Sequence, residues 1–422
     1  MPNPPMAGEA TGETGTRHAT RGAFAAGYAL LVLIIGTNLP SPLYGMYAAR
    51  FGFSTLTVTL IVAVYAAVIV PSLLLAGPLA DVIGYRQVVM PALVLAIGGA
   101  LLFAFAAGTG WLFAARVVQG LSVGAATPAL TAALAATAPP GRQGRGSLLA
   151  STMTTGGSGL GPLLAGALAA SAPLPLRLPY LAEVALLGAA LLAAWRLPGR
   201  QGQLAKRWRP TVPRVPRVAR RRFAVAAAVS FLAWGVAYIM LALAPSYVSA
   251  RLHDSSPLIG GATAGLLLIC AAVIQFAFAR LPTRRAQTLG LVGLTIGLGG
   301  LVCAGRLSSV ALLLASVCIA GAGQGLAFMG ATRQASQAAP PDQRAGVAAA
   351  FWIASYLGGG LPVTATGLLA VRIGLVPAVD TVAIILAVAC LAVLAAVRAT
   401  IHDPEMTAAT ATATVARPGG AC

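Results

Sequence analysis

The chain has 422 residues, of which 58% are hydrophobic and 9% are charged, with a formal net charge of +19. Soluble globular domains contain about 25% charged residues, so this composition excludes a soluble domain and indicates a protein that crosses a bilayer several times. A large positive charge on a soluble chain would suggest nucleic-acid binding. Here the arginines lie between apolar runs, as they do in cytoplasmic loops, and we expect no nucleic-acid partner. The cysteines show no paired spacing, which predicts neither a disulfide framework nor a metal site.

Twelve apolar runs follow one another along the chain, and each can cross a bilayer as a helix of about 20 residues. The sequence therefore predicts an all-α polytopic membrane protein with twelve transmembrane helices in two pseudo-symmetric six-helix halves. The approximate bounds of the runs are 23–47, 55–77, 87–109, 111–137, 147–170, 178–195, 223–249, 257–279, 286–305, 308–332, 346–371 and 375–397.

Five segments organise these runs. A disordered cytoplasmic tail is predicted for residues 1–21, which are rich in Gly, Thr and Pro. The first half spans 22–196, a basic linker spans 197–222, the second half spans 223–398, and a cytoplasmic tail covers 399–422. The end of the first run, near Asn38, is polar and broken by prolines, which is tolerated where a helix lines a cavity.

Arginine alternates between the two sides of the predicted threading. Connections on one side hold about one arginine each, whereas those on the other side hold the remainder, including the linker cations. The positive-inside rule assigns the arginine-rich side to the cytoplasm and places both termini there. The use of arginine in place of lysine, with abundant alanine, is typical of a GC-rich bacterial genome and indicates the bacterial inner membrane.

An internal repeat relates the two halves. The stretch Gln119–Thr127 resembles Gln324–Thr332, and Ala138–Pro140 recurs as Ala339–Pro341. Two parallel halves related by an axis along the membrane normal place the substrate path between them.

A charge lies inside the fourth run, where Arg116 shares one helical face with Gln119 and Gly120. An arginine at the centre of such a helix costs about 2.5–3.5 kcal/mol on insertion scales, so it is expected to face a partner or a water-filled interior. The next run carries Gly157 and Gly161 on one stripe, where small residues let a second helix approach closely.

The segment Gly77–Arg86 resembles the cytoplasmic loop motif of the major facilitator superfamily, Gly-x-Leu-Ala-Asp-Arg-x-Gly-Arg-Lys. The resemblance implies that Asp81 and Arg86 form a charge latch between the halves, and that Gly77 and Gly84 shape the turn. Val82 and Tyr85 stand where the family usually has basic residues, which implies a weaker or redistributed latch.

Two further motifs resemble the drug:proton antiporter branch of this family. Arg116, Gln119, Gly120 and Gly124 are similar to its fourth-helix motif, whose arginine is associated with proton coupling. Gly157, Gly161, Pro162 and Gly166 are similar to its fifth-helix motif, in which Ala165 replaces a glycine. Gly261 and Gly265 of the eighth run offer a partner seam. The resemblance covers about residues 22–398 and implies a monomer that is driven by the proton gradient and needs no cofactor.

Proton coupling requires a titratable group, and the acidic residue that some antiporters carry in the first helix is replaced here by Asn38. Glu183 is the candidate, together with Arg116 and Gln119, because a desolvated carboxylate can exchange a proton near neutral pH. The alternative is that Glu183 lies at the membrane boundary and is simply solvated.

Aromatic or polar positions in otherwise aliphatic helices are candidates for the substrate cavity, although aromatic residues also serve as interface anchors. These positions are Asn38, Tyr44, Trp234, Tyr238, Gln275, Gln324, Trp352 and Tyr356. A cavity with few charges suits a hydrophobic or cationic organic compound.

The sequence thus predicts a secondary-active exporter of a small organic compound, which works by proton antiport and alternating access. A proton-coupled importer is the alternative within transport. A membrane-embedded enzyme is disfavoured because the histidines lie in tails or loops, and no metal-ligand cluster, nucleophile motif or Walker sequence is present.

Overall fold

The computed structural model describes residues 10–136, 143–171, 173–197, 215, 217–242, 257–338 and 344–399. Within these ranges the ordered elements are helices, and the predicted twelve long helices are all found there. Nine of them are long and apolar enough to cross a membrane, and two shorter apolar helical stretches cover Leu178–Ala194 and Gly265–Ala277.

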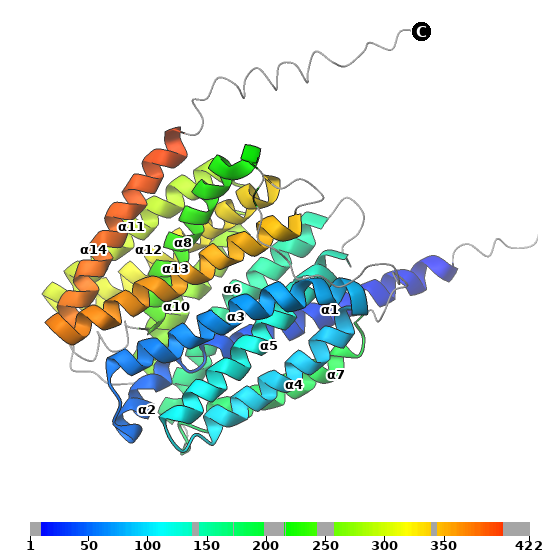
Figure 1. Cartoon of the computed structure of the whole chain (residues 1–422), viewed down its shortest axis with the longest axis horizontal. Helices are drawn as coiled ribbons and strands as arrows, with labels where there is room; N and C mark the ends of the chain where they lie inside the picture. Colours follow the sequence, from blue (N-terminus) through cyan, green and yellow to red (C-terminus); the bar gives the residue numbers. More distant parts are fainter. Residues whose placement is uncertain are drawn as a thin grey trace, which may run out of the picture.

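The helices of the first half lie side by side in one bundle (Figure 1). They are α1 (Ala10–Asn38), η1 (Ser41–Leu43), α2 (Tyr44–Phe51), α3 (Thr55–Ile83), α4 (Tyr85–Ala104), α5 (Thr109–Ala136), α6 (Gln143–Ser171) and α7 (Leu178–Ala194). Those of the second half are η2 (Arg217–Ala219), α8 (Arg220–Ala242), α10 (Pro257–Ala277), α11 (Thr283–Leu307), α12 (Val310–Gln337), α13 (Arg344–Ile373) and α14 (Leu375–Ala399).

The first helix differs from its prediction at both ends. It begins at Ala10, so residues 10–21 are helical and their assignment to a disordered tail is wrong. Adding a residue to a formed helix costs far less than nucleating one, which lets α1 extend past the bundle (Figure 1). At its other end α1 stops at Asn38, because Pro40 offers no backbone N–H and restricts the residue before it. The chain then turns through η1 into α2.

The linker prediction is tested only at its end. Residues 198–214 lie outside the described residues, and η2 with the first turn of α8 occupies positions 217–222. The first long helix of the second half, α8, therefore starts three residues earlier than the apolar pattern indicates, with Arg220, Arg221 and Arg222 in its first turn.

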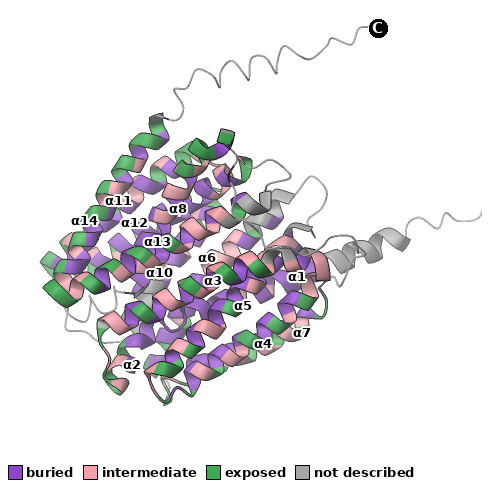
Figure 2. Ribbon diagram, in the orientation of Figure 1, coloured by how far each residue is buried: buried purple, intermediate pink, exposed green. Residues whose placement is uncertain are grey.

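Each half has its own hydrophobic core. One cluster of buried side chains lies entirely between Ala226 and Val397, and two others lie between Ala25 and Leu197. Exposed residues lie along the outward faces of the helices (Figure 2). The exposed side chains include large apolar ones, such as Leu192 at 73% and Phe276 at 68% exposure. In a membrane protein these faces are expected to contact lipid.

Two seams join the halves, one between α6 and α10 and one between α3 and α13. In the first, a Cβ on Gly159 would lie 2.8 Å from the Gly265 carbonyl, so the two backbones touch. In the second, Gly367 packs on the side chain of Thr59. A Cβ on Gly367 would lie 2.5 Å from the Thr59 hydroxyl oxygen. Figure 1 shows α3 and α13 running side by side along this seam.

The stripe of the fifth-helix motif faces another partner than predicted. Gly157 packs on the backbone of Leu31 and Gly161 on that of Ile35, both in α1 of the same half. The glycine that meets Gly265 is Gly159, which the motif comparison passed over. The helical rotation of α6 therefore places the motif inside the first half and a different glycine on the seam.

Replacement of Gly161 by alanine should lower stability, because the new methyl group would overlap the Ile35 carbonyl and backbone cannot rotate away. Overpacking of this kind costs about 1–3 kcal/mol. Gly188→Ala in α7 is the matched control, since nothing lies within 4 Å of its Cβ position. Thermal unfolding in detergent should show a lower Tm for Gly161→Ala alone, and equal Tm values would contradict the packing.

Candidate functional site

The guanidinium of Arg116 is buried on α5 and is held by neutral partners. Its Nε donates a hydrogen bond to the Tyr44 hydroxyl at 2.8 Å, and one terminal nitrogen donates to the Thr37 carbonyl at 2.8 Å. The same nitrogen donates to the Gln119 Oε1, and the Gln119 amide donates in turn to the Gly36 carbonyl at 2.8 Å. The guanidinium also lies 5.2 Å from the ring centre of Tyr65.

These bonds exist because α1 ends inside the bundle. The last carbonyls of a helix have no intrahelical donor, and a cation near that end is favourable. Arg116 and Gln119 supply the donors for Thr37 and Gly36. The side chains that the spacing places on one face of α5 thus cap the broken end of α1.

Glu183 lies beside this cap, on α7, with only 4% of its surface exposed. Its carboxylate rests against Gly36, where a Cβ would overlap it. The alternative of a solvated carboxylate at the membrane boundary is therefore wrong. Arg116 interacts with Glu183 electrostatically, but within the described residues no direct ion pair or hydrogen bond joins them.

A cavity lies between the halves. Its lining comprises Ile34, Thr37, Asn38, Tyr65, Val123, Thr154, Ser158, Trp234, Tyr238, Trp352, Ser355 and Tyr356. A second, smaller space shares Thr37, Asn38, Tyr65 and Tyr238 with it and reaches Arg116. The capped end of α1 is thus the boundary between the cavity and the buried charges.

The two sides of the cavity differ in chemistry. The second half contributes an aromatic wall, in which the rings of Trp234 and Tyr238 lie 5.8 Å apart and those of Trp352 and Tyr356 also 5.8 Å apart. Phe328 of α12 supports this wall, with its ring 5.4 Å from that of Trp234. The first half contributes amide and hydroxyl groups.

Five of the eight residues predicted for the cavity line it, namely Asn38, Trp234, Tyr238, Trp352 and Tyr356. Tyr44 instead holds Arg116, and Gln275 bridges to α6, as described below. Gln324 is fully buried, and neither polar atom of its amide has a partner within the described residues. These three assignments to the lining are corrected, because helix rotation turns the side chains into helix contacts.

Sequence reasoning also missed lining residues. Thr154 and Ser158 stand one turn apart on α6 beside the glycine motif, and Ser355 and Tyr65 lie on the facing helices. The four-residue spacing of the first two hydroxyls was an available signal. Small hydroxyl residues are common in membrane helices, however, and the signal is weak by itself.

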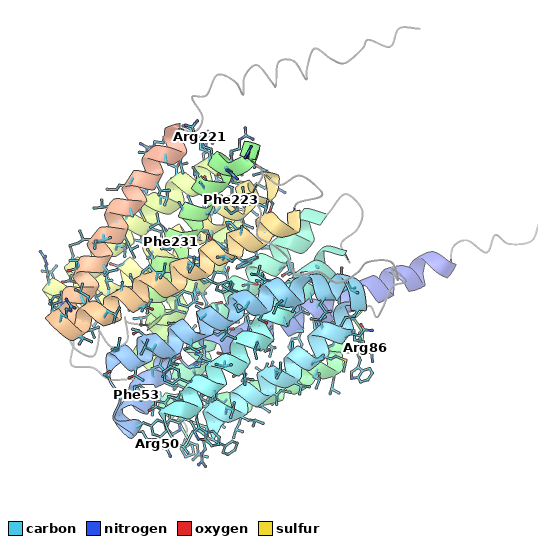
Figure 3. All side chains as sticks on the ribbon, in the orientation of Figure 1. Arg50, Phe53, Arg86, Arg221, Phe223 and Phe231 are labelled. Atoms are coloured by element: carbon cyan, nitrogen blue, oxygen red, sulfur yellow. The ribbon has the colours of Figure 1, made fainter. Side chains whose placement is uncertain are left out.

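The predicted latch is described only in part. Gly84 adopts φ = +99° between α3 and α4, a backbone conformation that favours glycine, as the turn prediction requires. The guanidinium of Arg86 lies 3.9 Å from the ring centre of Trp195, at the end of the first half seen in Figure 3. The side chain of Asp81 lies outside the described part of the chain, as does the packing around Gly77, so the predicted pairing of Asp81 with Arg86 is not tested.

The remaining motif residues pack helices. Gly120 lies against Tyr65 and Val68, and Gly124 lies against Ile69 and Ser72, so both let α5 approach α3 closely. Two further residues of the fifth-helix motif, Pro162 and Gly166 of α6, are also buried.

Comparison with known proteins agrees with this architecture. Residues 26–363 match the family model of the Major Facilitator Superfamily, so the chain belongs to that family and is a transporter. A solved structure of a bacterial homolog to the human lysosomal transporter Spinster, inward-facing and unoccupied, superimposes with a TM-score of 0.69 at 17% identity. The match covers 90% of this chain and 97% of that one. No curated protein matches the sequence.

The repeated glutamines should respond oppositely to replacement by methionine. Gln119→Met removes the donor to Gly36 and the acceptor for Arg116, leaving buried polar groups unpaired at a cost of about 1–3 kcal/mol. Gln324→Met removes an amide that has no partner among the described residues, and should be neutral or stabilising. Thermal unfolding of both variants checks the signs, and an equal loss in Gln324→Met would reveal a hidden partner.

Proposed function

We propose that this transporter is a secondary-active exporter of a small hydrophobic aromatic compound, driven by proton antiport. It would act as a monomer in the bacterial inner membrane with both termini cytoplasmic, in keeping with its arginine distribution. The single observation that carries the proposal is the contact of a buried carboxyl, Glu183, with the same broken helix end that borders the cavity.

The cavity lining supports an uncharged aromatic substrate over a cationic one. Its aromatic wall of two tryptophans and two tyrosines offers stacking surfaces, and its opposite side offers Tyr65 together with amide and hydroxyl groups. Aromatic faces also attract cations, but none of the residues that line the cavity is acidic, and Arg116 borders the adjoining space. An organic cation there would approach Arg116, a like charge, and no carboxylate in the lining could bind it directly.

Glu183 is the group we expect to carry the proton. Its burial makes the charged form costly, and its contact with Gly36 ties its charge to the end of α1. Arg116 and Gln119 hold the neighbouring carbonyls, so a change of charge at Glu183 acts on the same group of hydrogen bonds. Proton uptake can thereby reposition Thr37 and Asn38 at the cavity wall.

Exchange of a proton for substrate at Glu183 would couple inward proton movement to export. Substrate would enter from the arginine-rich side while Glu183 is deprotonated, and leave on the other side as a proton binds. Carrying one positive charge inward yields about 2.3 kcal/mol per 100 mV, to which the pH gradient adds. Rocking of the halves about the central cavity alternates its exposure.

Proteoliposomes loaded with acid and given acridone, a neutral fluorescent aromatic, test the proposal. Wild type should release protons when acridone is added, and Glu183→Gln and Arg116→Ala should each lower the rate at least tenfold. The matched control is Asp380→Asn, which neutralises a carboxylate on α14 and should leave the flux unchanged. Acridone uptake without proton flux, or wild-type flux in Glu183→Gln, would refute antiport through this site; ethidium in place of acridone tests the cationic class.

The placement of Glu183 can be tested without removing it. In Gly36→Ala the new methyl group displaces the carboxylate, so proton release should fall while the carboxyl itself remains. Gly27→Ala on the same helix is the control, because its Cβ would lie 3.9 Å from Leu134 in ordinary contact. Equal proton release in both variants would show that the packing of Glu183 on α1 is irrelevant to coupling.

A further inference from the structure

Gln275 forms a polar contact between the two halves. This residue lies in the last turn of α10, and none of its surface is exposed. Its Oε1 accepts a hydrogen bond from the Ser151 hydroxyl at 2.8 Å, and its Nε2 donates to the Thr155 hydroxyl at 3.2 Å. Ser151 and Thr155 are one turn apart on α6, so one amide binds two hydroxyls of the other half.

The neighbouring contacts between α6 and α10 show at which end of the seam Gln275 lies. Next to it, a Cβ on Gly156 would lie 3.7 Å from the Cβ of Ala272, and further along Gly159 meets Gly265 backbone to backbone. Because the residue numbers rise on α6 as they fall on α10, the helices are antiparallel. Gln275 therefore marks the end of the seam where α10 leads into Arg280 and Arg284, which is the arginine-rich side.

We propose that Gln275, with Ser151 and Thr155, is a positioning latch that holds the arginine-rich side of the transporter closed. The inference rests on the rocking of the halves in the proposed function, and not on proton coupling or on the substrate. Opening that side draws the start of α6 away from the end of α10 and breaks both bonds. The tight glycine contact further along the seam can stay in place as the pivot.

The chemistry of the three groups suits a latch that must open repeatedly. All are neutral, so water entering the opened side can solvate them without the large cost of separating buried charges. Each bond contributes a net factor of about 2 to 13 to the closed state, and the two together about 5 to 150. This is enough to set the conformational equilibrium and little enough for a substrate to overcome.

Spin labels at Gln87 and Arg284 report the opening, because both residues are exposed and begin α4 and α11 on the arginine-rich side of opposite halves. In a background without the native cysteines, pulsed EPR should show a short and a long distance. Gln275→Met should lower the population at the short distance, relative to that at the long distance, by about tenfold. Thr155→Val, which loses one bond, should lower it by a smaller factor. Ser230→Ala is the control, since it breaks a 2.6 Å contact with Ser355 inside the second half.

A disulfide provides an independent measurement. The 3.7 Å Cβ spacing between positions 156 and 272 fits a disulfide, which needs about 3.5–4.5 Å. Gly156→Cys with Ala272→Cys should cross-link quickly, and adding Gln275→Met should slow the reaction in proportion to the fall in the closed fraction. Unchanged distance ratios and cross-linking in Gln275→Met would overturn the latch and make the whole seam a pivot. Neither measurement needs a substrate or a proton gradient, so failure of the latch and failure of antiport are separate results.

Discussion

The interaction on which the rest of this structure depends is the burial of Arg116 against the broken end of α1. A guanidinium inside an apolar bundle is tolerable only if its donors find acceptors, and a continuous helix offers none because its carbonyls are already bonded. Pro40 ends α1 early and thereby frees the carbonyls of Gly36 and Thr37. The need to pair the buried donors of Arg116 accounts for the break in α1, for the turn that places Tyr44 beside Arg116, and for the close approach of α5.

The same arrangement explains why the two halves are not equivalent despite their repeat. Gln324 corresponds to Gln119, yet the residue three positions before it is Gly321, where the first half has Arg116. Gly321 packs directly on the carbonyl of Leu267, so no side chain fits there. The first half therefore holds the charged cap, whereas the second half supplies the aromatic wall of the cavity.

Two kinds of contact join the halves at the seams: close backbone packing at glycines, and neutral hydrogen bonds. Glycines such as Gly159 bring the halves together where lipid removes any hydrophobic drive for helices to associate. The bonds of Gln275 instead join specific polar atoms of α10 and α6 across the seam. The alternating access that we propose would use both kinds of contact.

The sequence by itself determined the twelve helices, their division into halves and the face that joins Arg116 to Gln119. These features follow from hydropathy, charge and helical period, which are local properties. Tertiary structure decided that Gly157 faces α1 while Gly159 faces α10, that Glu183 is buried against Gly36, and that Gln275 bridges the halves. A helix surrounded by lipid and by protein is apolar on every side, so its sequence does not specify its rotation about its axis. That rotation is fixed only when all the helices pack together.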